Sequence, residues 1–536
     1  MNSVRRALLC VLVASVLSQS QSAFFPSPNY FKHAFSKPPQ ISLELPGTLR
    51  DLVQDGKLRL SVGDLARLVT ARNTQVWLAR LDVQGAEPAV LRATAPFDAR
   101  FTGSFNTSRA SSPTSTALDA TTQLSQNTQF NYQQQFTSGT TYQVGVSGVK
   151  TASNNSFVFL NPSIRAVLNV NLSQPLLRNR GFFVQRAPIV IARINRQVSR
   201  SRFEQIITEQ LQAAENQYWD TVQARENLVV LRNSLALAEK SYERDKRALE
   251  LGALPPLDIF RSQAEVANRK VQVTTAEYQL KQQEDALRRL IAADLDPGVR
   301  SLPMDLVDAP GGSLATQGME MEAAVEQALR RRPEIDILRR QQVIEETNVR
   351  VAANSLRPDL RLGGNYASSG LGGNSGVLTG GLSDALRQVL EFNSPTYGFS
   401  LTLNLPIRNR QAEADMATAE ISQRRNLFQQ RDMEQQIILD VRNAVNRLEQ
   451  SKANIAGSKA ARDLAVKNLE AEQRKYDLGA TTIFFVLEAQ QRASDAETQL
   501  LNATVAYRKA ATSLYRSTGS LLDERKIVVD QALAVK

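Results

Sequence analysis

The stretch Tyr476-Asp-Leu-Gly-Ala-Thr-Thr-Ile-Phe-Phe-Val-Leu-Glu-Ala-Gln490 decides the fold, because it joins two long helical segments through a short glycine turn. The first half of the chain contains a similar sequence, Leu251-Gly252-Ala253, which lies 227 residues before Leu478-Gly479-Ala480. Glycine reaches positive φ without a Cβ penalty and therefore ends helices. The two turns predict that one elongated unit occurs twice. At the same offset Ile259, Ser262 and Gln263 match Val486, Ala489 and Gln490.

Very long helices are predicted on both sides of each turn. Residues 183–250 would extend over about 100 Å as a helix, and residues 411–477 are similar. Return helices are predicted over about 257–293 and 483–517. Apolar residues of the long and the return helices keep a 3-4 spacing, which is typical of helices packed as coiled coils. The spacing is clearest at Leu228, Leu231, Leu235, Ala238, Tyr242 and Leu249, and again at Val486, Ala489, Ala493, Ala496, Leu500, Ala503, Tyr507, Ala510 and Leu514.

Alternation of apolar and polar residues marks four segments of roughly ten residues, two in each half of the chain. They lie near residues 97–106, 165–173, 359–366 and 396–405. Any one of them could be a strand of a soluble, half-buried sheet. Four in one chain without a hydrophobic helix favour the strands of a membrane barrel. The intervening residues 108–160 and 363–381 are predicted to be loops, with a possible hairpin near residues 140–147.

A shared signature follows each strand pair. Leu172-Ser-Gln-Pro-Leu-Leu-Arg-Asn-Arg180 resembles Leu403-Asn-Leu-Pro-Ile-Arg-Asn-Arg410. Proline is tolerated where a strand has ended and a helix has not begun. Pro175 and Pro406 are therefore predicted strand-to-helix junctions.

The N-terminus has the pattern of an export signal. Arg5 and Arg6 precede an apolar run from Ala7 to Leu17, which is too short to span a bilayer, and small residues follow. We expect a signal peptide over residues 1–23. The single cysteine, Cys10, lies inside it and would be lost on cleavage.

The chain can then be divided by composition and by the repeat. An N-terminal arm is expected over residues 24–59, the first repeat over 60–293 and a linker over 294–320. The second repeat is expected over 321–520 and a C-terminal tail over 521–536. Ser61 is a plausible N-cap for a helix at the start of the first repeat, with a counterpart over residues 321–332 of the second.

Composition argues against several classes of function. The net charge is +11, but basic and acidic residues are interleaved, which favours solvated helix faces over a nucleic-acid partner. His33 is the one histidine of the chain, so few side chains are suited to bind a metal ion or to act as a general base. We therefore expect no cofactor, no metal, no catalytic residues and no enzymatic activity.

Over roughly residues 60–520 the chain resembles the TolC family of outer-membrane efflux and secretion ducts. The resemblance rests on the repeated strand-strand-helix-helix unit, the segments Gln174-Pro-Leu-Leu-Arg-Asn-Arg-Gly181 and Arg357-Pro-Asp-Leu360, and the two Leu-Gly-Ala turns. It implies a mainly α protein with membrane β structure. It also implies a homotrimer, with a 12-stranded β-barrel continuous with a long α-helical barrel. The strand count agrees that one chain cannot act alone, because four strands cannot close a barrel.

The same resemblance implies a function and a location. The protein would be the outer-membrane channel of a tripartite efflux or type I secretion system, a passive and gated export duct. It would sit in outer-membrane lipid, extend through the periplasm, and work with a periplasmic adaptor and an inner-membrane pump. The tip turns, Leu251, Gly252, Ala253, Leu478, Gly479 and Ala480, would dock the adaptor.

The resemblance also assigns gate candidates. Glu488 matches an acidic ring position, whereas Phe485 stands where a second acidic ring usually lies and could form an apolar constriction. Asp258 and Tyr476 match a pair that ties the two hairpins together. Thr481 replaces a gate arginine, so the corresponding link is in doubt. An alternative function is a non-conducting structural coiled coil that spans the periplasm; a periplasmic adaptor is disfavoured, because it would contain one hairpin instead of two.

Overall fold

The computed structural model describes residues 53–113, 120–251, 256–311, 320–375 and 379–534. The chain divides into two units, Met1–Pro46 and Gly47–Lys536, and all described residues lie in the second. The predicted signal peptide, most of the predicted arm, and Gly252 and Ala253 of the first tip turn lie outside the described residues.

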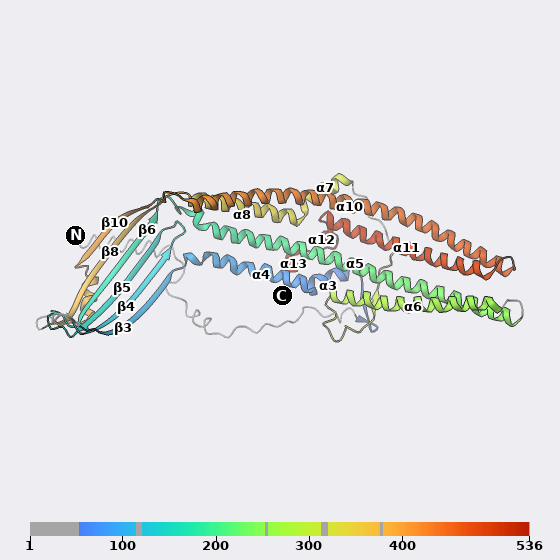
Figure 1. Ribbon diagram of the computed structural model, residues 1–536, viewed down its shortest axis with the longest axis horizontal. Helices are drawn as coiled ribbons and strands as arrows, with labels where there is room; N and C mark the ends of the chain where they lie inside the picture. The colour runs from blue at the N-terminus through green and yellow to red at the C-terminus, as the bar shows by residue number, and fades with distance from the viewer. Residues whose placement is uncertain (1–52, 114–119, 252–255, 312–319, 376–378, 535–536) are drawn as a thin grey trace. The chain divides into compact units, whose positions relative to one another are not determined.

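Two antiparallel helical hairpins dominate the second unit (Figure 1). The first consists of α5 (Phe182–Glu250) and α6 (Pro256–Leu290), and the second of α10 (Arg410–Asp477) and α11 (Ile483–Ser517). These bounds lie within a few residues of the predicted ones. The duplicated helical architecture expected from the two Leu-Gly-Ala turns is therefore confirmed.

Two further helices complete the helical part next to the sheet. Helix α4 (Thr74–Thr94) packs against α5, and α8 (Pro333–Ser355) packs against both α5 and α10. Each follows a short helix that the sequence predicts, α3 (Val62–Arg72) and α7 (Met321–Arg331). Ser61 caps α3 as expected, since its side chain accepts a hydrogen bond from the Asp64 backbone.

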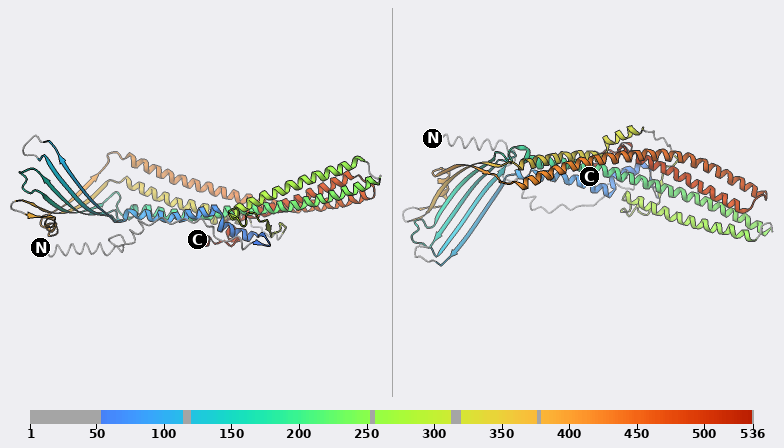
Figure 2. Two further views of the ribbon diagram at one scale, coloured as in Figure 1. Left: turned by 90° about the horizontal axis from the view of Figure 1, so that it is seen from below. Right: turned by 45° about the horizontal axis from the view of Figure 1, so that its top comes forward.

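One large antiparallel sheet lies at one end of these helices, as Figure 1 and Figure 2 show. Its strand order is β10-β8-β6-β5-β4-β3, with the two-residue β9 (Thr379–Gly380) paired to β8. The six long strands are β3 (Arg100–Ser111), β4 (Thr122–Gln135), β5 (Thr141–Ser153), β6 (Ser163–Pro175), β8 (Asp359–Asn374) and β10 (Pro395–Asn404).

The expectation of four strands per chain is wrong. About half of the predicted loop 108–160 forms β4 and β5, and most of the Gly-rich segment 363–381 belongs to β8. The remainder of that segment includes β9, and the short helix α9 (Leu382–Leu390) packs on β6 and β8. The prediction failed because polar and small residues can also form strands when neighbouring strands provide hydrogen-bond partners for their backbone N–H and C=O groups. The count of 12 strands for three copies, which rested on four, no longer holds.

The two faces of the sheet differ in chemistry. Directly opposed residues share a face, and the pairings Phe101↔Tyr132, Val144↔Val170 and Tyr366↔Tyr397 place apolar and aromatic residues together. The other face is polar. It carries Asn127, Gln129, Asn131 and Gln133 on β4, Gln143 and Ser147 on β5, Asn169 and Asn171 on β6, and Asn365 on β8. Helix α9 covers the apolar face over part of β6 and β8. The uncovered part of that face is suited to lipid, and the opposite face is suited to water.

The predicted linker and the predicted tail both contribute secondary structure, although the tail was expected to be irregular. Residues Met304–Leu306 form β7, which joins β1 (Val53–Gln54) and β2 (Lys57–Leu60) in a small second sheet. The tail contains α12 (Leu521–Glu524) and α13 (Val529–Ala534). Leu521 and Leu522 lie in the same buried cluster as Phe203 of α5, so the tail is part of the packed core.

Candidate gate at the helical tip

The second tip turn ends α10 with a left-handed glycine. Gly479 has φ 73°, and the Ala480 backbone N–H donates to the Lys475 carbonyl at 2.8 Å. This arrangement closes a helix with a residue that needs no Cβ. Leu478, just before the glycine, is 85 % exposed, and Leu251 at the end of α5 is 84 % exposed. Both turns therefore expose a leucine side chain at the end of the hairpins that is farthest from the large sheet.

A buried carboxylate links the two hairpins close to these turns. Asp245 of α5 is fully buried, and it accepts a hydrogen bond from the Tyr476 hydroxyl at 3.1 Å. Its second oxygen accepts from Ser262 of α6. Because Tyr476 belongs to α10, one side chain of the first hairpin holds the end of the second.

Neighbouring residues add three further contacts across the same interface. The Arg244 guanidinium lies over the Tyr476 ring at 4.4 Å and reaches the Asp477 carboxylate at 3.2 Å. One turn of helix away, the Gln490 amide of α11 donates to the Ser241 hydroxyl at 3.2 Å. We call the whole group the inter-hairpin cluster. Its members are Ser241, Arg244, Asp245, Ser262, Tyr476, Asp477 and Gln490.

Two polar contacts join α5 and α11 beyond this cluster, beside the apolar packing of Val505 against Val222 and its neighbours on α5. Thr498 contacts Asn227 at 3.3 Å, and Gln223 donates to Asn502 at 2.7 Å. Hydrogen bonds of this kind exchange readily with water when an interface opens, whereas apolar contacts would expose surface. Near the tip, the two hairpins are thus joined by hydrogen bonds and an ion pair.

The predicted gate pair is placed only in part. Tyr476 does reach the other hairpin, but the contact that the structure describes is with Asp245, which sequence reasoning missed. The side chain of Asp258 lies outside the described residues, so its pairing with Tyr476 stays a prediction. Thr481 is half-buried in the second turn.

The other two candidates lie on α11, just after the turn. Glu488 is partly exposed and pairs with Arg492 one turn along the same helix, at 2.7 Å. Phe485 is 50 % exposed and packs edge to face against Phe484, which is 51 % exposed. Neither Glu488 nor the phenylalanine pair is enclosed by the described residues of the chain, so both keep exposed surface.

The same residues border an open groove between α6 and α11. Its volume is about 570 Å³, and its lining mixes charged, amide and apolar side chains. The lining residues are Arg261, Ala264, Glu265, Asn268, Phe484, Leu487, Glu488 and Gln491. A groove of this form suits a helix or hairpin of a partner better than an enclosed small molecule.

The strand-to-helix junctions lie where the sequence places them. Pro175 is the last residue of β6, and Pro406 stands between the end of β10 and the start of α10. In both cases the chain passes directly from the sheet into a helix of nearly 70 residues.

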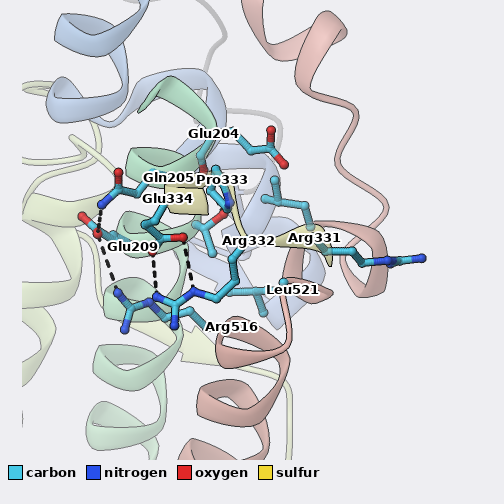
Figure 3. A pocket seen from close by; sticks show the side chains of 12 residues that line it. Glu204, Gln205, Glu209, Arg331, Arg332, Pro333, Glu334, Arg516 and Leu521 are labelled. Atoms are coloured by element: carbon cyan, nitrogen blue, oxygen red, sulfur yellow. Dashed lines mark hydrogen bonds and ion pairs between the residues drawn. The ribbon is translucent and has the colours of Figure 1, made fainter. Parts of the chain in front are cut away.

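A charged pocket halfway along the helices serves as a structural junction (Figure 3). Its space of about 20 Å³ is no larger than one water needs. Arg332 pairs there with Glu334 at 2.7 Å and with Asp440 at 3.2 Å. Burial works against the charged guanidinium, yet these two carboxylates raise the pKa of Arg332. The ion pairs of this pocket hold the start of α8 against its neighbours, and the pocket has no space for a substrate.

Two features are absent from the described part of the chain. Within it, no three histidine, cysteine or acidic side chains are grouped so that they could hold a metal ion. None of its helices is long and apolar enough to cross a membrane.

Comparisons with known proteins agree with this geometry. Residues 324–520 match the family described as outer membrane efflux protein. The outer membrane protein TolC of Vibrio cholerae is 23 % identical over 322 residues, which cover 59 % of this chain and 69 % of that protein. Among solved structures, CusC has a TM-score of 0.64 at 16 % identity, covering 94 % of this chain and 99 % of CusC. The CmeC outer membrane channel of Campylobacter jejuni has a TM-score of 0.61 at 16 % identity, with 94 % of each chain covered.

These likenesses define a class of outer-membrane channels rather than of enzymes. The prediction of a TolC-like outer-membrane efflux protein is confirmed, and so are the efflux role and the location in the outer membrane and periplasm.

Proposed function

We propose that three copies of this chain form a closed duct across the outer membrane and the periplasm. The observation that carries the proposal is the open sheet. Its edge strands β3 and β10 have no outer neighbour in the described chain, and every one of their residues is exposed. A sheet with a lipid-facing side cannot keep an open edge in a bilayer, because its backbone groups would find no partners. Pairing β3 of one copy with β10 of the next removes all edges.

Disulfide crosslinking tests this closure, since Cys10 is the only cysteine of the chain. In a Cys10→Ser background, Thr102→Cys on β3 is combined in turn with Ser400→Cys, Thr402→Cys or Asn404→Cys on β10. We expect one combination to give covalent trimers on oxidation, whereas each single-cysteine variant stays monomeric in denaturing gels. Full oxidation without crosslinked trimers in any combination would favour the non-conducting coiled coil.

The duct is passive and gated at the helical tip. The inter-hairpin cluster supports this, because it holds α5, α6 and α10 together by hydrogen bonds and ion pairs near the turns. When these contacts break, the hairpins can separate and widen the passage, and no chemical step is needed. Opening therefore requires an input that favours the separated hairpins.

A periplasmic adaptor, linked to an inner-membrane pump, would supply that input by binding the tip. Large apolar side chains stand exposed there, which is unusual for a surface that faces only water. They are Leu251, Leu257, Phe260, Leu478, Phe484 and Phe485. An adaptor hairpin that covers these residues would take part of the apolar surface out of water and so favour one arrangement of the tip.

Ion selectivity distinguishes the two gate candidates. If Glu488 lines the pore, three copies form an acidic ring, and Glu488→Gln should lower the ratio of cation to anion permeability severalfold. If the Phe485 ring is the constriction, Phe485→Ala should raise conductance instead. Planar-bilayer recordings measure both. Glu391→Gln, which removes the same charge just beyond α9, is the matched control and should leave selectivity unchanged.

A further inference from the structure

The first repeat contains two more long strands than the second. Between its first helices and its long hairpin, the first repeat has β3, β4, β5 and β6. The equivalent part of the second repeat has only β8 and β10 as long strands, beside the two-residue β9. The hairpin of β4 and β5 is therefore an addition to the duplicated plan, and it lies inside the sheet instead of at its edge.

The added hairpin is fully incorporated into the sheet. Strand β4 pairs with β3 over residues Thr122 to Gln133, and β5 pairs with β6 over Thr141 to Thr151. Both pairings are antiparallel and continuous. In the register of these ladders, β3 and β6 are separated by the two added strands, so they cannot pair with each other.

The inner turn of the added hairpin rests on the strand-to-helix junction. The Ser138 carbonyl accepts from the Gly181 backbone at 3.2 Å, and Gln135 donates to Gln185 of α5 at 2.9 Å. Gly139 has φ 91°, and a Cβ there would lie 2.7 Å from the Asn179 carbonyl oxygen. A turn fitted this closely to the start of α5 belongs to the permanent architecture.

The added strands also keep the division between the two faces. Phe130, Tyr132, Val144 and Val146 continue the apolar face, while the polar face of β4 consists of amide and hydroxyl side chains. Across the described strands, charges on the polar face are confined to the two ends. They are Arg165 near the outer end, and Arg100, Asp359 and Arg361 near the helices. The middle of this face is uncharged.

We propose that the duct leaves the cell through an 18-stranded barrel, built from three copies of the six long strands, whose wide lumen is uncharged over its middle and admits hydrated solutes by size rather than by charge. The inference rests on the trimer proposed above. Because barrel diameter grows nearly linearly with strand number, this barrel is about 1.5 times as wide as one of 12 strands. Barrels of this size leave an aqueous channel, and amide side chains offer donors and acceptors to a polar cargo without preferring either charge.

Barrel width can be measured from the distance between equivalent residues. With a strand spacing of ~4.8 Å and a tilt of ~40°, the backbone radius is about 18 Å for 18 strands and about 12 Å for 12 strands. Three equivalent backbone positions are then separated by about 31 Å or about 21 Å respectively.

The experiment places one spin label on β6. Asn169→Cys, in the Cys10→Ser background, is labelled in purified full-length protein, and dipolar spectroscopy gives the distance between copies. We expect a distance near about 31 Å, shortened slightly by labels that point inward. A distance near about 21 Å would overturn the wide barrel while leaving the trimer intact. A sample without any inter-copy distance would refute the trimer itself.

A deletion variant gives an independent comparison. Replacing residues 112–162 with a short Gly-Ser turn removes β4 and β5 and lets β3 pair directly with β6. The inter-copy distance should fall by about a third, and the largest neutral polyethylene glycol that enters the pore should become smaller. An unchanged distance and an unchanged size limit would show that the hairpin does not widen the barrel. If the deletion variant does not fold, the full-length distance still decides the matter.

Discussion

Replacing Asp245 with alanine should increase the open probability of the channel more than any other single change near the tip. Asp245 is buried and accepts a hydrogen bond from Tyr476 of the opposite hairpin. A hydrogen bond to a charged group contributes about 1.5–3 kcal/mol, so its loss shifts an opening equilibrium that breaks it by about 10- to 100-fold in each subunit. Single-channel recording in planar bilayers measures the change.

Two related variants separate the contact from a general loss of packing. Tyr476→Phe removes only the hydroxyl and should open the channel in the same direction, with a smaller effect. Glu239→Gln is the matched control on α5, because Glu239 contacts Lys270 of its own hairpin at 3.6 Å and makes no ion pair with the described residues of the second hairpin. Equal open probabilities for Asp245→Ala and Glu239→Gln would contradict a role for the inter-hairpin cluster in gating.

The largest loss of stability is expected from Arg525→Leu. Glu215 of α5 is completely buried, and Arg525 donates to both of its oxygens at 2.5 and 2.8 Å, while Thr512 donates at 2.8 Å. These hydrogen bonds raise the pKa of Arg525. Removing the arginine leaves a buried carboxylate without its counter-ion, which typically costs about 3–5 kcal/mol.

Thermal unfolding of the purified, detergent-extracted protein measures this effect. Arg331→Leu is the matched control, since Arg331 pairs with Asp523 of the same tail segment on the surface. An exposed pair contributes only about 0–1 kcal/mol, so the control should unfold close to the wild type. The double variant Glu215→Leu with Arg525→Leu should recover much of the loss, because it removes both buried charges. Similar unfolding temperatures for the single variant and the control would contradict this account of the tail.

The helical part of the fold was predictable from the sequence, because its signals are strong and repeated. Gly479 ends α10 with the φ value that glycine allows, and the periodic apolar residues of α11 define its buried side. The added strands were missed for a physical reason. On β4, Gln126 and Thr128 stand on the apolar face beside Leu124 and Phe130, so the alternation is too weak to see without the neighbouring strands.

The candidate gate was only half predictable. Tyr476 lies next to a recognisable turn. Asp245 lies within α5, where an acidic residue is expected, from the sequence alone, to be exposed to solvent. One signal was available. The repeat pairs Ser262 with Ala489, so a polar residue occupies a position that is apolar in the second copy. Ser262 is the residue that bonds the buried carboxylate.

Reversible crosslinking of the two hairpins tests the central claim most directly, namely that the chain forms a duct that opens when its hairpins separate. Ser241 and Gln490 are in contact across the hairpin interface, so cysteines at both positions can be joined by a short, reducible thiol crosslinker. Single-channel conductance is recorded before crosslinking, after crosslinking and after reduction. We predict that crosslinked channels stay closed and that reduction restores their current steps. Crosslinked channels that conduct as well as reduced ones would contradict the account.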